Sequence, residues 1–195
     1  MHEVDGRDHE LNRMDIINRS PNPHALNEQL ANHLKLAVET YDGVLVVEQV
    51  KTDGYGTMSP ILREVLSELS QKHPEKTIIV DSREFASEYQ ALSLKMNLRE
   101  ALITLEKYDF NHGKLDSSDS LSAALIAAEA IWKIHHKPVF ITLGKKGIAG
   151  VSKGDFFHIP GYRTEGPIDI VGAGDSVLAG IGITLCAGGT VQETA

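Results

Sequence analysis

The apolar residues of this chain fall into short continuous runs separated by segments with helical spacing. The continuous runs predict strands at residues 43–48, 77–81 and 139–143, followed by a strand pair at 148–151 and 156–159. Helical spacing predicts helices over 26–38, 59–69, 84–94, 97–105 and 118–136, with one more after Gly174. A weak strand pattern also covers residues 10–17. Strands that alternate with helices predict an α/β fold, in which helices cover both faces of a parallel sheet.

Signals at the ends of two segments support these assignments. Ser59 is a predicted N-cap, because its side-chain oxygen can accept from the first helical N–H groups, and Pro60 suits the first helical position. Near the end of the sequence, Thr190 and Glu193 have the spacing of a capping box, which predicts that another helix begins there. Since that helix is cut short and the start is abrupt, we expect the sequence to be part of a longer protein.

Composition and charge narrow the functional classes. Of the 195 residues, 42% are hydrophobic and 24% are charged, which is typical of a globular chain with one sizeable core. The formal net charge of -8 argues against a nucleic-acid-binding surface. No segment is long and apolar enough for a signal peptide or a membrane span, so we expect a cytoplasmic protein without membrane contact. The single cysteine, Cys186, lies in an apolar helical run and is predicted to be a buried thiol in a reducing compartment.

Residues 169–176, DIVGAGDS, carry the strongest functional signal. Gly172, Ala173 and Gly174 are three small residues at the start of a predicted helix, where successive N–H groups can hold an anion. Asp175 follows at once, and the helix dipole alone favours an acidic residue there, which leaves a purely structural role open. A bound anion would repel this carboxylate unless it takes a proton from the attacking group, which favours Asp175 as a general base.

Two nucleotide-binding fingerprints are absent from this region. A GxGxxG motif fails because its sixth position is Val177, and no GxxxxGK[ST] motif occurs. This disfavours an NAD-dependent oxidoreductase.

The segment TLGKKG, from Thr142 to Gly147, follows a predicted strand. Gly144 and Gly147 allow the backbone to approach a nucleotide, and the Thr142 hydroxyl can donate to a phosphate. Taken alone, these residues are better explained by a glycine turn between two strands.

Asn97 and Glu100 have the spacing of a capping box, which by itself accounts for both residue types. Residues 81–83, Asp-Ser-Arg, end a predicted strand and place Arg83 where it could meet an anionic ligand, although a solvated loop is an equal interpretation.

These segments occur in the order found in the ribokinase-like carbohydrate kinases, the PfkB family, which the chain resembles over nearly its whole length. Residues 169–176 with Ala179-Gly180 resemble the second signature of that family, residues 142–147 its T-L-G-x-x-G loop, and residues 97–100 its N-x-x-E motif. Residues 81–83 resemble its D-P-R, with serine in place of proline.

A weaker likeness, carried by Arg13 and Asp15, is to a segment of the kinase half of bacterial ADP-heptose synthases. An edge strand with outward-facing charges explains those residues as well.

The resemblance implies a three-layer α/β/α core with a mainly parallel sheet, and an ATP-dependent sugar or sugar-phosphate kinase. Asp175 would be the base, and the backbone of Gly172, Ala173 and Gly174 the anion hole for the transferred γ-phosphate. The implied ligand contacts are Asn97 and Gly174 to phosphate, Glu100 to Mg²⁺ through water, and Asp169 with the Val171 carbonyl to a monovalent cation, K⁺. The implied nucleotide contacts are Thr142, Leu143, Gly144, Lys145, Lys146 and Gly147. Ile170 replaces a threonine that is usual in the family, which weakens the cation assignment.

The chain also departs from the family. It has no counterpart of the family's N-terminal segment, glycine-rich first signature or β lid, and residues 47–49 read Val-Glu-Gln where relatives have S-D-Y. We therefore expect residues 1–195 to be a single, partial kinase domain, its C-terminal nucleotide-binding part, acting on a small sugar or sugar phosphate. A homodimer would form through the lid region that is missing here. The sequence does not identify the sugar. The alternative is a non-catalytic nucleotide-binding or regulatory module, or an inactive fragment of such a kinase.

Overall fold

The computed structural model describes residues 2–4, 7–9, 16, 18–109, 119–162 and 171–194. Its helices are α1 (His24–Thr40), α2 (Pro60–Lys72), α3 (Leu98–Lys107), α4 (Ser120–His135) and α5 (Ala173–Cys186). Its strands are β1 (His2–Val4), β2 (Arg7–His9), β3 (Gly43–Glu48), β4 (Thr77–Ser82), β5 (Ser93–Asn97), β6 (Val139–Thr142), β7 (Ile148–Ser152) and β8 (Asp155–Ile159). Short 3₁₀ turns are η1 (Ala86–Glu88), η2 (Gly144–Lys146) and η3 (Val191–Glu193).

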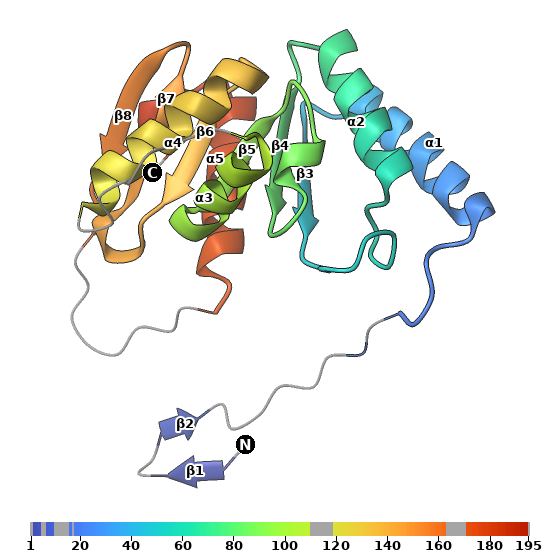
Figure 1. Cartoon of the computed structure of the whole chain (residues 1–195), viewed down its shortest axis with the longest axis horizontal. Helices are drawn as coiled ribbons and strands as arrows, with labels where there is room; N and C mark the ends of the chain where they lie inside the picture. Colours follow the sequence, from blue (N-terminus) through green and yellow to red (C-terminus); the bar gives the residue numbers. More distant parts are fainter. Residues whose placement is uncertain are drawn as a thin grey trace.

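Six strands form one sheet in the order β3-β4-β5-β6-β7-β8 (Figure 1). The strands from β3 to β6 are parallel, whereas β7 and β8 are antiparallel to their neighbours. The α/β prediction is confirmed, and the predicted strand pair is the β7–β8 hairpin. β1 and β2 pair separately, antiparallel to each other.

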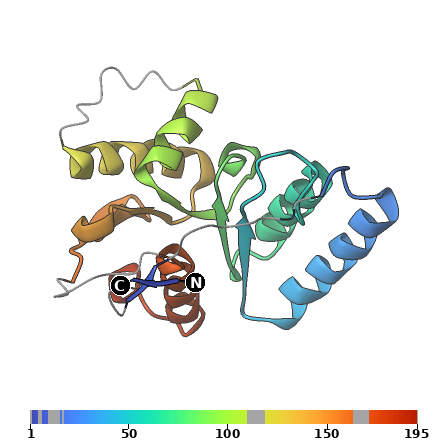
Figure 2. The same ribbon diagram turned by 90° about the horizontal axis from the view of Figure 1, so that it is seen from below.

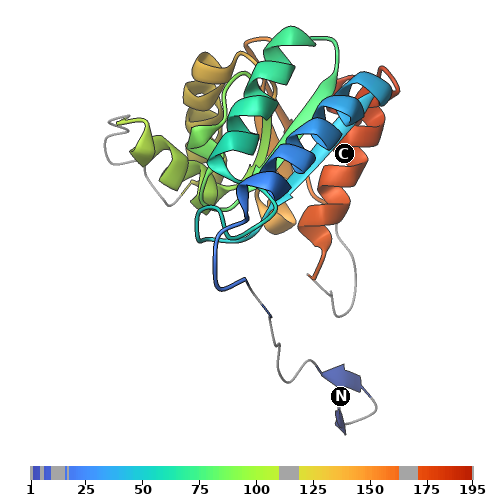
Figure 3. The same cartoon turned by 90° about the vertical axis from the view of Figure 1, so that its right-hand side faces the viewer.

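Helices cover both faces of the sheet. The larger core joins α1, α2, α3 and α4 to one face, with residues such as Leu66, Leu94 and Ile131 fully buried. The smaller core packs α5 on the other face, where Leu178 and Ile181 meet Ile79. Figure 2 shows α5 separated from α3 and α4 by the sheet, and Figure 3 shows α1 and α2 side by side. This arrangement brings the N-terminus of α5 toward the carboxyl ends of the parallel strands.

The predicted helix over residues 84–94 is wrong. The chain there makes only the turn η1, passes through Ala91 at a φ of 54°, and enters β5. β5 pairs with β4 on one side and β6 on the other, so that Leu92 and Leu94 are completely buried. The apolar spacing therefore reflected burial inside the sheet rather than one face of a helix.

The other local predictions have mixed outcomes. Ser59 caps α2 by accepting from the Leu62 N–H, and the Thr190–Glu193 capping box is present ahead of the short turn η3. Cys186 was expected to be buried, but it is exposed, because it is the last residue of α5. The strand predicted over residues 10–17 lies outside the described residues except for Ile16.

Candidate active site

Asp81, Asn97 and Thr142 lie at the carboxyl ends of the neighbouring parallel strands β4, β5 and β6. Asn97 and Thr142 stand opposite each other in the register of β5 and β6. The Thr142 hydroxyl donates to the Met96 carbonyl at 3.4 Å, which holds it at this edge. Three of the motifs found in the sequence therefore share one edge of the sheet. Ligands of open α/β sheets bind beyond such strand ends.

Asn97 and Glu100 form the capping box of α3. The Asn97 side-chain oxygen accepts from the Glu100 N–H at 2.9 Å, and the Glu100 carboxylate accepts from the Asn97 N–H at 2.8 Å. Burial raises the pKa of the Glu100 carboxyl and the charge of Asp81 adds to this, while the Asn97 hydrogen bond and the positive Lys95 and Arg83 oppose it. The structural role is therefore present, and the carboxylate lies within electrostatic reach of the other charged groups at the edge.

Lys95 is a buried charged residue at this edge that the sequence analysis missed. Its Nζ lies 2.5 Å from the Asp81 carboxylate, and the two side chains are only 6% and 13% exposed. Both point to the face covered by α5, because Lys95 pairs in register with Phe140 of the smaller core and Asp81 follows Ile79 by two residues. A single lysine inside the run SLKMN was the available signal, and the adjacent helix prediction obscured it.

The motif at residues 172–175 forms the first turn of α5. Gly172 is the N-cap in the left-handed region, with φ 75°, which favours glycine. The N–H groups of Ala173, Gly174 and Asp175 then have no acceptor within the helix. A Cβ placed on Gly174 would lie 3.1 Å from the Lys95 ammonium, so this turn lies directly against the Lys95–Asp81 pair. Asp175 is exposed in the first turn, and Asp169 lies outside the described residues.

The loop between β6 and β7 carries the residues expected at the nucleotide. The Leu143 N–H donates to the Gly147 carbonyl at 2.8 Å, which closes the loop. Gly147 has φ 90°, and a Cβ there would lie 2.0 Å from the Ile159 carbonyl, so this glycine is required by the turn itself. Gly144 also has a positive φ, but its Cβ would meet open space.

Beside this loop is a pocket of about 280 Å³, lined by Leu121, Lys145, Lys146, His158, Pro160 and Gly161.

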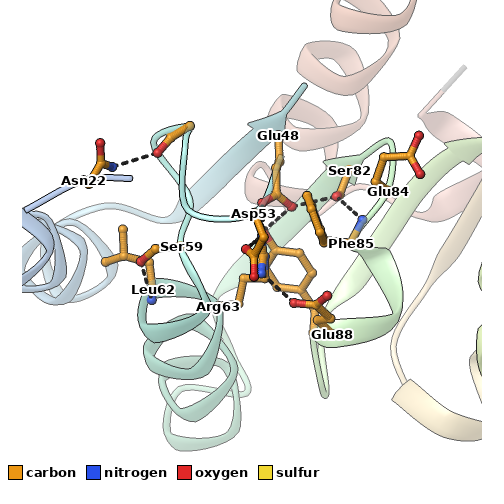
Figure 4. A network of polar contacts seen from close by, with 12 residues as sticks. Asn22, Glu48, Asp53, Ser59, Leu62, Arg63, Ser82, Glu84, Phe85 and Glu88 are labelled. Carbon is orange, nitrogen blue, oxygen red and sulfur yellow. Dashed lines mark hydrogen bonds and ion pairs between the residues drawn. The ribbon is translucent and has the colours of Figure 1, made fainter. Parts of the chain in front are cut away.

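A second polar cluster, also missed, lies at the ends of β3 and β4 on the face covered by α2 (Figure 4). Arg63 is 1% exposed and donates to Glu48 at 2.8 and 3.1 Å, to Asp53 at 2.8 Å and to Glu88 at 2.5 Å. Burial alone lowers the pKa of Arg63, but the hydrogen bonds and charges of these carboxylates outweigh it and raise the pKa.

This Arg63 network explains two departures from the resemblance. Glu48, which stands in the Val-Glu-Gln segment, accepts from Arg63. It also accepts from Tyr89 at 3.0 Å and from Ser82 at 2.6 Å, and a proline at position 82 could not make the second bond.

The described residues contain no group of three or more His, Cys, Asp or Glu side chains arranged to hold a metal ion. Within the same ranges, no helix has the length and apolar character needed to cross a membrane.

The sequence profile of the pfkB family carbohydrate kinases matches residues 11–195. The chain belongs to this family. It is 28% identical over 186 residues to the bifunctional protein HldE of Helicobacter pylori strain J99, covering 93% of this chain and 36% of that protein. A second HldE protein, from Hyphomonas neptunium, is 25% identical over 187 residues and is covered to the same extent, 36%.

Solved structures of a ribokinase and of a phosphofructokinase-2 share the fold. Phosphofructokinase-2 from Escherichia coli in complex with potassium superposes with a TM-score of 0.67 at 19% identity, over 92% of this chain and 55% of that one. Ribokinase from Thermotoga maritima gives a TM-score of 0.60 at 21% identity, over 86% of this chain and 52% of that one. The fold is therefore ribokinase-like. The chain spans about a third of the length of its curated relatives and about half of these structures.

Proposed function

We propose that residues 1–195 form the phosphoryl-transferring part of an ATP-dependent sugar or sugar-phosphate kinase. The observation that carries this proposal is the approach of the first turn of α5 to the Lys95–Asp81 pair, at the strand edge that also holds Asn97. In the proposed reaction, Asp175 accepts the proton of an attacking sugar hydroxyl. The backbone N–H groups of Gly172, Ala173 and Gly174 stabilise negative charge on the γ-phosphoryl group as it moves.

The residues present suit ATP and Mg²⁺. Asp81 and Glu100 offer carboxylate oxygens near a helix N-terminus that favours phosphate. Mg²⁺ typically binds one or two carboxylates and completes its shell with phosphate and water, so a larger acidic cluster is not required. We assign Glu100 to the metal through water, Asn97 and Gly174 to phosphate, and residues 142–147 to the nucleotide.

A monovalent cation completes the proposed ligand set. We assign K⁺ to Asp169 and the Val171 carbonyl, with Asp169 outside the described residues. A solved structure of the related phosphofructokinase-2 from Escherichia coli is a complex with potassium.

The proposed acceptor is a small sugar phosphate. The curated relatives are HldE proteins, and phosphofructokinase-2 from Escherichia coli has been solved with fructose-6-phosphate. This agrees with the segment around Arg13, which resembles the kinase half of ADP-heptose synthases. We therefore place heptose phosphates first in a substrate panel.

Calorimetry with MgATP, followed by a coupled ADP-release assay over a panel of sugars and sugar phosphates, tests the proposal. Asp175→Asn should abolish phosphoryl transfer while MgATP affinity stays within a few fold, because only the proton acceptor is lost. Asp155→Asn is the matched control, since Asp155 is an exposed carboxylate on β8, and it should leave turnover unchanged. Near-normal turnover in Asp175→Asn would contradict the base assignment.

A non-catalytic nucleotide-binding module is the second candidate. The observation that favours it is that residues 47–49 read Val-Glu-Gln where relatives have S-D-Y, and that Glu48 there is held by Arg63. MgATP binding without turnover on any sugar of the panel would support this candidate over the kinase.

A further inference from the structure

We infer that the Arg63–Asp53 pair positions the acceptor sugar without touching it. Through Asp53, the buried Arg63 holds the loop of residues 49–58 at the carboxyl ends of β3 and β4, and this loop forms the acceptor side of the site. The inference rests on the proposed function and adds to it the part of the site that receives the sugar. It is carried by the place of the loop, by the way the loop is held, and by a surplus of carboxylates around Arg63.

The loop of residues 49–58 lies on the side of the site away from the proposed nucleotide residues. It follows β3, whereas residues 142–147 stand at the end of β6, and β4 and β5 separate these two parallel strands. In phosphoryl transfer the attacking and leaving oxygens lie roughly in line across the γ-phosphoryl group. Because ADP leaves toward β6 in the proposed reaction, the attacking hydroxyl comes from the side of β3.

Polar contacts place this loop beside the end of β4. Lys51 Nζ lies 3.7 Å from the Glu84 carboxylate, and Arg83 Nη2 lies 3.5 Å from Gln49 Oε1. Burial raises the pKa of the Glu100 carboxyl, the proposed metal contact, and the charge of Arg83 partly offsets this rise. The loop therefore contacts a residue that is within electrostatic reach of the proposed phosphoryl-transfer centre.

The loop is held by side chains outside it (Figure 4). Arg63 Nη2 donates both to Glu48, at the end of β3, and to Asp53 in the loop, each at 2.8 Å. Asn22 donates to the Gly56 carbonyl at 2.7 Å. The donors of a guanidinium diverge in a fixed, planar fork, and Arg63 is 1% exposed, so its direction is set by packing. The two bonds from Nη2 therefore fix the position of Asp53 relative to the end of β3.

Arg63 has more carboxylate partners than neutrality requires. Glu48, 4% exposed, already pairs with it inside the fold. Asp53 and Glu88, 47% and 42% exposed, lie where water could solvate them instead. Three carboxylates around one guanidinium leave an excess of negative charge, and ion pairs with exposed partners stabilise a fold only slightly. The contact with Asp53 therefore contributes more to the position of the loop than to stability.

The first test is steady-state kinetics of residues 1–195 with the best acceptor of the sugar panel. Asp53→Ala should lower kcat/KM for the acceptor about 10-fold, mainly through its KM, because the loop holds the sugar but takes no part in proton transfer. The KM for MgATP should stay within about 2-fold. Asp53→Asn keeps an oxygen that can accept from Arg63, and it should recover most of the loss.

Glu88→Ala is the matched control. Glu88 is a partner of the same guanidinium with similar exposure, but it lies in η1 rather than in the loop. Its replacement should leave acceptor kinetics unchanged. Both alanine variants should shift Tm by no more than about 4 °C, which verifies that each is folded.

Hydrogen exchange gives a readout that does not depend on turnover. The amides of residues 50–57 should exchange about 5-fold faster in Asp53→Ala, because one bond that closes the loop is lost. The amides of β4 and β5 should keep their wild-type rates in the same variant. Glu88→Ala should keep wild-type exchange in the loop.

Four results would overturn the inference. If Asp53→Ala keeps wild-type acceptor kinetics or wild-type exchange in the loop, the pair does not position the sugar, and the proposed kinase stands. If Glu88→Ala loses as much acceptor kcat/KM as Asp53→Ala, the network acts through stability alone. If Asp53→Ala raises the KM for MgATP by the same factor, the loop belongs to the nucleotide side. If the wild type phosphorylates no sugar of the panel, the proposed function and this inference both fall.

Discussion

Two buried cations lie at the same edge of the sheet, on opposite faces, and they differ in how completely they are paired. Arg63, under α2, donates to Glu48, Asp53 and Glu88. Lys95, under α5, has one carboxylate partner among the described residues. The difference distinguishes two uses of a buried charge. A cation with nearly all of its donors paired fixes the chain around it, whereas a cation with unused donors can still accept an oxygen ligand.

The Arg63 network joins segments that are distant in sequence. Glu48 ends β3, Asp53 belongs to the following loop, and Glu88 is in the turn η1. The guanidinium also lies 4.0 Å from the centre of the Phe85 ring, a cation–π contact. Because these carboxylates accept from four of its five N–H donors, the network is expected to stabilise the fold and to contribute nothing directly to ligand binding.

The largest expected effect on the free energy of unfolding comes from the Arg63 network. Arg63→Met should lower the free energy of unfolding by about 3–5 kcal/mol, because it leaves Glu48 buried without its cation. Urea unfolding measures this, with Arg99→Met on the exposed surface of α3 as the control. MgATP affinity per folded molecule should be unchanged. A loss of less than 1 kcal/mol would mean that the three ion pairs do not hold the fold.

A third buried basic side chain, His135, shows how burial changes the pKa when no carboxylate is paired with it. It is 1% exposed and contacts the Tyr108 hydroxyl at 2.8 Å. Burial lowers its pKa from 6.5 to about 4. The folded protein therefore resists protonation, and the unfolded chain gains protons first as the pH falls below 6.5.

Stability should accordingly decline between pH 6.5 and about 4, and this contribution should level off below that. At about 1.4 kcal/mol per pKa unit, the contribution of this histidine is about 3 kcal/mol. Urea unfolding at several pH values should show a shallower decline in His135→Leu. His33→Leu, at an exposed position on α1, should keep the wild-type slope. An unchanged slope in His135→Leu would show that folding does not shift the pKa of His135.

The smallest expected effect on stability comes from the Lys95–Asp81 pair. Replacing both partners, Asp81→Asn with Lys95→Met, should change the free energy of unfolding by about 1 kcal/mol or less, because no charge is left alone. The same denaturation assay measures it beside Arg63→Met. If the double variant lost as much free energy of unfolding as Arg63→Met does, the two clusters would not differ, and the Lys95–Asp81 pair would be a second structural network.

The sequence predicted features that local patterns determine. Apolar runs identified β3, β4 and β6, and the capping chemistry of Ser59 and of Asn97 with Glu100 is local by nature. The GAGD motif predicted the first turn of α5, because small residues followed by an acidic residue are typical of a helix start.

What the sequence could not reveal depends on contacts between distant segments. β5 is recognisable as a strand only once β4 and β6 flank it, and Lys95 becomes a site residue only through that pairing. Likewise, Arg63 on an amphipathic helix resembles a surface residue until Glu48, 15 positions earlier, is brought beside it. The exposure of Cys186 follows from the place where α5 ends.

Asp81 and Ser82 are neighbours on β4, yet Asp81 pairs with Lys95 beneath α5 and Ser82 donates to Glu48 beneath α2. Consecutive side chains of a strand point to opposite faces, so this dipeptide divides the two clusters between the two sides of one backbone. Substitutions at position 82 therefore disturb the Arg63 network, and those at position 81 disturb the pair with Lys95. The two faces of one short strand segment can therefore be altered one at a time, by choosing position 81 or position 82.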